Sequence, residues 1–149
     1  MNLIDTVQLV LKQKGQNVWH VSPEACVYEA IEIMAEKHAG ALMVVSEDRL
    51  VGVVSERDYA RKVILQGKSS KQTQVREIMT SPAIVVAPGQ TVEEAMRTMT
   101  NNHIRHLPIV ENGVLLGVVS IGDLVKWIIS AHEHTISQLN SYIAGAYPG

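Results

Sequence analysis

The feature that most constrains the fold of this chain is an internal repeat without gaps. Shifting the sequence by 65 residues aligns Val18–Leu65 with Ala83–Ser130, and 16 of the 48 aligned pairs are identical. The longest shared run, Gly-Val-Val-Ser, ends at Ser55 in the first copy and at Ser120 in the second. An aspartate follows three residues later in both copies. Agreement of this extent predicts that one structural unit occurs twice in the chain.

Each copy predicts the order strand, helix, strand, strand, helix. The first strand covers 18–21 or 83–86, and the next two cover 41–45 with 50–54 or 107–110 with 114–119. Thr91 and Glu94 have the spacing of a capping box, and Asn112-Gly113 is a hairpin signal. The first helix of each copy carries one apolar stripe, formed by Val27, Ala30, Ile31 and Met34 and by Val92, Ala95, Met96 and Met99.

These elements predict an α+β fold in which two repeats pack sheet to sheet across a pseudo-twofold axis, because a unit of about 50 residues buries too little surface alone. We expect an N-terminal helix in 1–17, a first repeat in 18–66, a polar linker in 67–80, a second repeat in 81–130 and a helical extension in 131–149. The N-terminal helix, Leu3–Lys14, is amphipathic and is predicted to end at Gly15. The last helix has an apolar seam near heptad spacing, formed by Ile129, Ile136, Leu139 and Ile143.

The composition argues against several classes of protein. Thirteen Lys and Arg residues against fifteen Asp and Glu residues give a net charge of −2, unlike a nucleic-acid-binding protein with a broad basic surface. No apolar run reaches the roughly 18 residues of a membrane span, and the N-terminus lacks the basic start of a secretory signal. The single cysteine, Cys26, is expected to be a small buried residue at a helix start. A reducing cytoplasm is therefore the expected location.

The duplicated Ser-x-x-Asp motif, Ser55 with Asp58 and Ser120 with Asp123, allows two interpretations. In the first, the serine caps a helix and the aspartate completes a capping box. In the second, the helix start is a ligand site, where backbone N–H groups and the helix dipole favour a phosphate and the serine adds a donor. The aspartate would then accept both hydroxyls of a ribose. The motif by itself is compatible with either.

The tandem, together with Arg105-His106-Leu107-Pro108-Ile109-Val110 ahead of the second motif, resembles the cystathionine-β-synthase (CBS) domain pair, or Bateman module, from about Val18 to Ser130. The resemblance implies a regulatory sensor that binds adenine nucleotides, such as AMP, ATP, NAD(H) or S-adenosylmethionine, in two clefts between the repeats. It implies that Asp58 with Ser55 serves one cleft and Asp123 with Ser120 the other, each aspartate holding the ribose diol.

The same resemblance implies where adenine and phosphate are held. In the family, the first strand contacts adenine, at positions that correspond to Trp19 and Ile84, near the ribose of the partner cleft. Trp19 is then either a stacking surface for a purine or a core residue of its strand. Phosphate is often contacted by a basic residue just before the Leu-Pro of the second repeat, here Arg105 or His106.

The two clefts are expected to differ in charge. The first repeat has Gly40 and Ala41 where the second has its basic pair, and Arg57 is matched by Gly122. Arg57, Arg105 and His106 are candidate phosphate ligands, against the alternative of solvated arginines and an ordinary packed histidine. The two clefts could therefore hold different ligands.

The sequence offers no complete catalytic or metal-binding set. The pairs His103 with His106 and His132 with His134 lack further ligands at suitable spacing. Phosphate-binding P-loop and Gly-x-Gly-x-x-Gly patterns are absent, and no nucleophile has a neighbouring base. We therefore expect no enzyme, no catalytic cofactor and no metal.

We expect a nucleotide sensor that acts through ligand-dependent conformation or association. The resemblance implies a homodimer, and a protein target is a further expected partner, without nucleic acid or membrane. The alternative is a nucleotide-independent interaction scaffold in which both Ser-x-x-Asp motifs only cap helices.

Overall fold

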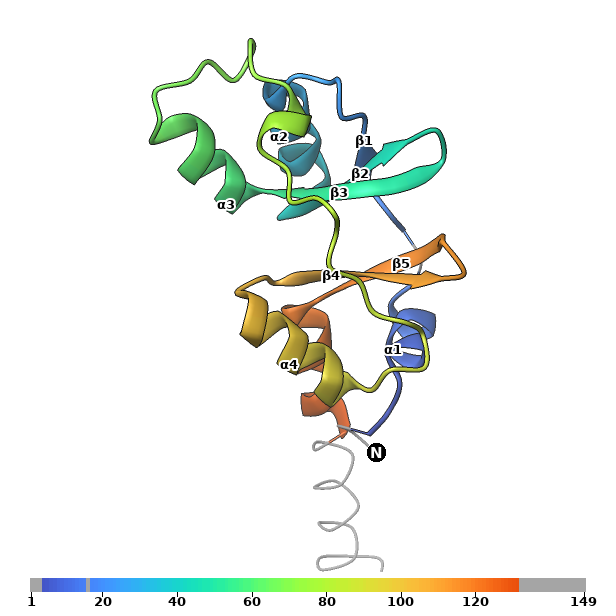
Figure 1. The fold of residues 1–149 in the computed structure, drawn as a ribbon. Helices are drawn as coiled ribbons and strands as arrows, with labels where there is room; N and C mark the ends of the chain where they lie inside the picture. The colour runs from blue at the N-terminus through green and yellow to red at the C-terminus, as the bar shows by residue number, and fades with distance from the viewer. Residues whose placement is uncertain (1–3, 16, 132–149) are drawn as a thin grey trace, which may run out of the picture. The chain divides into compact units, whose positions relative to one another are not determined.

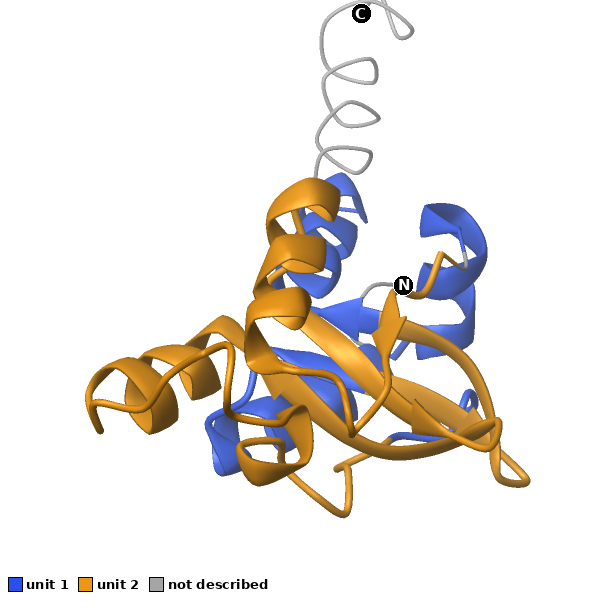
Figure 2. Ribbon diagram, turned by 90° about the horizontal axis from the view of Figure 1, so that it is seen from above, with its two compact units in different colours: residues 1–15, 86–107, 119–149 blue, residues 16–85, 108–118 orange. Residues whose placement is uncertain are grey.

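The computed structural model describes residues 4–15 and 17–131, which form two compact units (Figure 2). Unit 1 comprises residues 1–15, 86–107 and 119–149, and unit 2 comprises residues 16–85 and 108–118. Each unit therefore joins stretches that are far apart in the sequence. Several predicted positions lie outside the described residues: Leu3, Ile136, Leu139, Ile143, His132 and His134.

Unit 2 contains a three-stranded sheet in the order β1-β2-β3 (Figure 1). The strands are β1 (His20–Val21), β2 (Ala41–Ser46) and β3 (Arg49–Ser55). Strand β1 runs parallel to β2, and β2 runs antiparallel to β3. The helices of this unit are α2 (Val27–Lys37), α3 (Glu56–Tyr59) followed directly by the π-helix η1 (Ala60–Ile64), and the 3-10 helix η2 (Val75–Glu77).

The core of unit 2 is built on the apolar stripe of α2. Val27, Ala30 and Met34 are buried in one cluster with Leu42 of β2 and Val54 of β3. Burying an aliphatic side chain of this size contributes about 1.5–3 kcal/mol, so the stripe holds α2 on the sheet. The helical stripe predicted from the sequence is confirmed.

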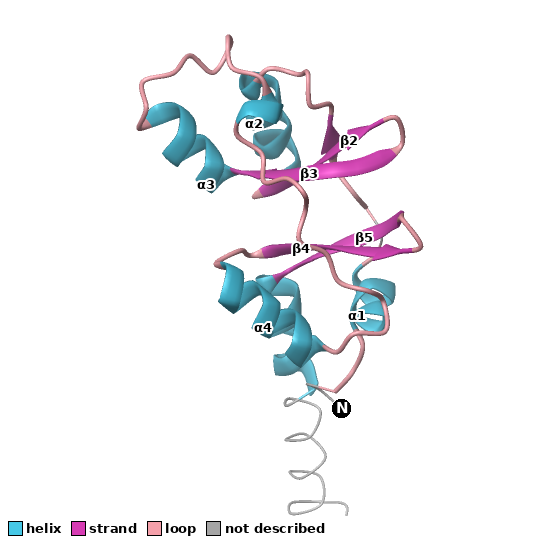
Figure 3. Ribbon diagram, in the orientation of Figure 1, coloured by secondary structure: helices cyan, strands magenta, loops and turns pink. Residues whose placement is uncertain are grey.

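Unit 1 contains α1 (Val7–Lys14), α4 (Val92–Asn102) and a helix whose described part covers residues 121–131 (Figure 3). Strands β4 (His106–Glu111) and β5 (Val114–Ser120) pair as a two-stranded sheet, most of which, residues 108–118, is assigned to unit 2. The α+β class is confirmed, whereas the bounds of the five predicted segments stay a prediction. Among the described residues, no helix is both long enough and apolar enough to span a membrane.

The first strand of each repeat is shorter than predicted. Only His20–Val21 of the segment 18–21 is strand, and in the segment 83–86 only Val86 takes part in a bridge. The apolar, β-branched composition favours extended chain, but a strand also needs a partner along its length. Here the pairing covers two residues in one copy and one in the other.

Both hairpins turn through two residues with positive φ, as a tight type I′ turn requires. Asn112 and Gly113 have φ of 52° and 80°, which confirms the Asn-Gly signal. Glu47 and Asp48 adopt φ of 51° and 62° at the same place in the first repeat, without glycine. The turn geometry is therefore duplicated although the turn residues differ.

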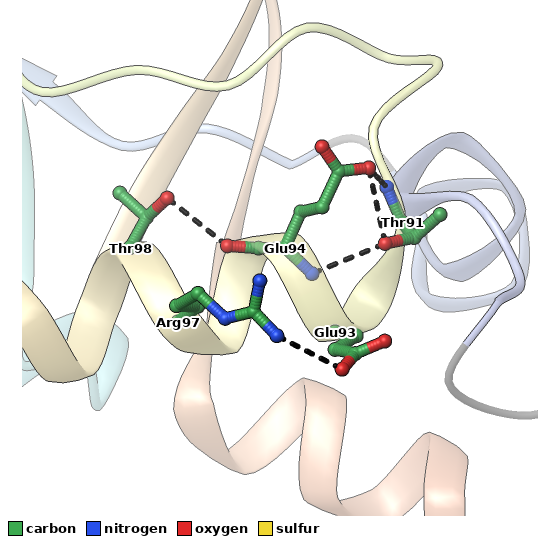
Figure 4. A network of polar contacts seen from close by, with 5 residues as sticks. All are labelled: Thr91, Glu93, Glu94, Arg97 and Thr98. Atoms are coloured by element: carbon green, nitrogen blue, oxygen red, sulfur yellow. Dashed lines mark hydrogen bonds and ion pairs between the residues drawn. The ribbon is translucent and has the colours of Figure 1, made fainter.

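The predicted capping box of α4 is present (Figure 4). The Glu94 N–H donates to Thr91 Oγ1, and the Thr91 N–H donates to Glu94 Oε1, both at 3.1 Å. One turn further along, Arg97 pairs with Glu93 at 3.0 Å and the Thr98 hydroxyl donates to the Glu94 carbonyl. These local contacts fix where α4 begins.

The segment before each repeat supports a helix of the other repeat. The Val27 N–H of α2 donates to the Thr73 carbonyl at 2.8 Å, within the predicted linker. The Val92 N–H of α4 donates to the Asp5 carbonyl at 2.8 Å, ahead of α1. Thr73 is buried. Part of the predicted linker is therefore packed structure that satisfies the first N–H groups of a helix.

Candidate functional site

Each Ser-x-x-Asp motif lies where a strand ends and a helix begins. In the first copy the Asp58 N–H donates to Ser55 Oγ at 3.2 Å, and the Ser55 N–H donates to Asp58 Oδ2 at 2.9 Å. The same two bonds between Ser120 and Asp123 measure 3.0 and 2.8 Å. Both motifs are complete capping boxes, so the first interpretation holds structurally. The ligand-site interpretation is compatible with the same geometry, because a carboxylate has about four lone-pair positions and can accept further hydrogen bonds while it caps the helix.

A lysine neutralises each motif aspartate, and the two lysines come from different elements. In unit 2, Lys62 Nζ lies 3.2 Å from Asp58 Oδ1 and also donates to the Ile78 carbonyl at 2.9 Å. In unit 1, Lys14 at the end of α1 lies 2.5 Å from Asp123 Oδ2. Both carboxylates are mostly shielded from solvent, with side chains 14% and 24% exposed. Each site therefore combines an acceptor and a cation.

The charged groups of unit 1 shift the pKa of Asp123 and the pKa of His106. Burial acts to raise the pKa of Asp123, but the Lys14 ammonium and the hydrogen bonds from Ser120 outweigh it, and the pKa lies below its ordinary value. Burial lowers the pKa of His106, and the positive charges of Lys14 and Arg105 add to this, while Asp123 opposes it. At neutral pH the site therefore presents a carboxylate, two cations and a neutral imidazole.

Two segments of the chain, residues 15–64 and 75–130, match the sequence model of the CBS domain. The chain belongs to the CBS domain family. The two matched segments correspond to the two repeats, and each one includes a complete strand–helix junction with its Ser-x-x-Asp capping box.

Similar proteins support this assignment. A mitochondrial CBS domain-containing protein of Arabidopsis thaliana, CBSX3, is 40% identical over 152 residues, which cover 95% of this chain and 73% of that protein. A CBS-domain protein structure from Burkholderia ambifaria MC40-6 is 49% identical, with a TM-score of 0.81 over 84% of this chain and 94% of that one. The CBS domain pair of protein MJ0100, in complex with 5′-methylthioadenosine and S-adenosyl-L-methionine, shares the fold at 23% identity and a TM-score of 0.76 over 86% of this chain and 98% of that one.

The remaining predicted site residues of the CBS pair divide between the units. Arg105 and His106 belong to unit 1 with Asp123, whereas Trp19, Ile84 and Arg57 belong to unit 2 with Asp58. Of these side chains, His106 and Ile84 are half-buried, and the two arginines are exposed. Since the charges of Asp123 and Arg105 both act on the pKa of His106, these three residues lie near one another.

Trp19, which directly precedes β1, is not a core residue. Its side chain is 39% exposed, and the Lys37 ammonium lies 4.7 Å from the ring centroid. The core interpretation of Trp19 is therefore wrong, and its ring is a surface that a cation already contacts. Cys26 also differs from the prediction, since it is half-buried at the N-cap of α2.

Sequence reasoning missed both lysines. Lys62 follows Asp58 at i+4, a spacing at which opposite charges meet on a helix, so this pair could have been found. Lys14 is 109 residues from Asp123, and no local pattern links the two. Among residues 4–15 and 17–131, no group of three or more His, Cys, Asp or Glu side chains is arranged to hold a metal ion.

Proposed function

We propose that this CBS pair is a regulatory sensor that binds an adenine nucleotide at one or both of its Ser-Asp pairs. The observation that carries the proposal is the duplication of one arrangement: a shielded carboxylate at a helix start with a lysine within 3.2 Å. A carboxylate accepts both hydroxyls of a ribose, and a nearby cation attracts a phosphate. A nucleotide carries both groups on one molecule.

The proposed roles follow the chemistry of each side chain. Asp58 and Asp123 accept the ribose diol, while Ser55 and Ser120 orient the carboxylates from the helix starts. In unit 1, Arg105 contributes charge toward the phosphate and His106 a hydrogen bond.

In unit 2, Arg57 has the corresponding phosphate role. The exposed face of Trp19 suits stacking on adenine, which is worth about 1–3 kcal/mol per base, and Ile84 adds apolar contact. Purine stacking there has to displace or share the Lys37 ammonium, since that group already contacts the ring.

The ligand class is adenine nucleotides of the AMP, ATP or NAD(H) type. The fold is compatible with adenosine derivatives, since protein MJ0100 binds two of them. We propose that binding changes the conformation of the pair or its association, as a homodimer or with a protein target, without catalysis. The cytoplasm is the proposed location, although the Arabidopsis relative is mitochondrial by name.

One observation favours a second candidate, a nucleotide-independent interaction scaffold. Both Ser-x-x-Asp motifs form complete capping boxes, so both have a structural role without any ligand. The two candidates predict different effects for the aspartates. If the protein is a scaffold, Asp58→Ala and Asp123→Ala each lower the free energy of unfolding by about 0.5–2 kcal/mol and change no ligand binding.

Isothermal titration calorimetry with AMP, ATP, NAD⁺ and S-adenosylmethionine tests the sensor. We expect heat of binding for wild type and a loss of about tenfold or more in affinity at the altered site, since a hydrogen bond to a charged acceptor contributes about 1.5–3 kcal/mol. If millimolar concentrations of all four compounds give no heat with the wild-type protein, the scaffold is the better description.

A further inference from the structure

In unit 1 the Oδ2 atom of Asp123 is fully engaged. It accepts the Ser120 N–H at 2.8 Å and lies 2.5 Å from the ammonium of Lys14. A carboxylate oxygen has two lone pairs, so these two donors use its ordinary capacity. A ribose diol that donates one hydroxyl to each carboxylate oxygen therefore competes with one of the two.

The two donors differ in how readily they can leave. The Ser120 N–H is backbone, held at the end of β5 where the next helix begins. The Lys14 ammonium stands on a flexible four-carbon stem, and its side chain is 33% exposed. Lys14 is therefore the group that an incoming diol displaces.

The backbone of Lys14, by contrast, is held beside the site. The Val7 N–H of α1 donates to the Gln90 carbonyl at 2.8 Å. Just before α1, the Asp5 carboxylate accepts from Trp127 Nε1 at 2.9 Å. These bonds tie α1 to the rest of unit 1, so an ammonium that leaves Asp123 stays near any ligand that replaced it.

The local charge favours an anion near that ammonium. Lys14 and Arg105 are positive, Asp123 is negative, and the lowered pKa of His106 leaves its imidazole neutral at pH 7. These four groups together carry one positive charge. Once the diol has taken Oδ2, a 5′-phosphate is the part of the nucleotide that can pair with the displaced cation.

We propose that Lys14 is a specificity-determining residue of the unit 1 site, an inference that rests on the proposed function. It leaves Asp123 when the ribose binds and pairs with the ligand's 5′-phosphate, so the site selects AMP over adenosine.

The test compares AMP with adenosine by calorimetry in an Asp58→Ala background, which removes the diol acceptor of the other site. Lys14→Met is expected to weaken AMP binding about tenfold and to leave adenosine binding unchanged or tighter, because no ion pair has to be displaced. Lys12→Met is the matched control, since Lys12 is an exposed lysine in the same last turn of α1. It should preserve both affinities.

The ratio of the two affinities separates the outcomes. If Lys14→Met damages the fold, it weakens the binding of both ligands, and thermal unfolding of each variant detects such damage. In that case Lys14→Arg, which keeps the positive charge, should still bind AMP more tightly than adenosine. An unchanged AMP-to-adenosine ratio in Lys14→Met overturns the role of Lys14 while the proposed function stands. Binding that disappears in the Asp58→Ala background alone also overturns it. If wild type binds no adenosine compound, the proposed function itself fails, and the role of Lys14 fails with it.

Discussion

Replacing Gly52 by alanine tests why the shared run begins with glycine. Gly52 is buried in β3, and a Cβ there would lie 2.7 Å from the Thr80 carbonyl oxygen and 2.8 Å from Met79 Sδ. The Met79 side chain can move aside, but the Thr80 oxygen belongs to the backbone. That oxygen accepts from the Val53 N–H at 3.1 Å, and the Thr80 N–H donates to the Val53 carbonyl at 2.9 Å.

The size of the effect follows from these contacts. To admit the methyl group, β3 and the chain at Thr80 have to separate by roughly half an ångström, and overpacking of this kind costs about 1–3 kcal/mol. The separation also weakens two hydrogen bonds, each contributing about 0.5–1.5 kcal/mol. We expect Gly52→Ala to lower the free energy of unfolding by about 3 kcal/mol, which lowers Tm by about 6–12 °C for a chain of this size.

Urea denaturation followed by circular dichroism measures this change. Gly89→Ala is the control, because a Cβ at Gly89 meets nothing within 4 Å and its φ is not positive. That variant should stay within about 0.5 kcal/mol of wild type. If Gly52→Ala unfolds at the same urea concentration as Gly89→Ala, close packing is not the reason for the glycine.

Three further predictions concern local contacts. Ser120→Ala removes the acceptor of the Asp123 N–H and should cost about 1 kcal/mol in urea denaturation, whereas Ser120→Thr should restore most of it. Glu47→Asn combined with Asp48→Gly gives the first hairpin a turn suited to its positive φ and should raise the free energy of unfolding by about 1 kcal/mol; a destabilised variant would contradict the turn assignment. Folding lowers the pKa of His106, so as the pH drops the imidazole is protonated in the unfolded state before it is protonated in the folded state. The free energy of unfolding should therefore fall as the pH drops below about 6.5 toward the folded pKa. His106→Gln should remove this part of the pH dependence, and identical pH profiles of urea midpoints would refute it.

Most of the secondary structure was predictable because it depends on neighbours in the chain. The stripe that includes Val27 and Ala30 is buried as its helical spacing predicts, and Thr91 caps α4 through Glu94 three residues on. The prediction was wrong where partners decide the structure. The segment 83–86 has strand composition, yet only Val86 is paired.

The candidate site and the predicted linker follow the same division between local contacts and contacts made by folding. Ser120 and Asp123 are three residues apart, so their contact could be predicted from the motif. The burial of Thr73 could not, because the surrounding segment is polar and has the composition of a linker. Its hydroxyl is satisfied by the Ser69 carbonyl, and its own carbonyl accepts the first N–H of α2.

From its amino acids alone, this chain specifies a duplicated unit, the order of elements in it and two serine–aspartate pairs, because all of these depend on periodicity and on residues a few positions apart. Tertiary structure alone decided that Lys14 pairs with Asp123 across 109 residues, and that the Thr80 carbonyl occupies the space a side chain at Gly52 would need. Both contacts join segments that meet only after the chain between them has folded, so no local pattern records them.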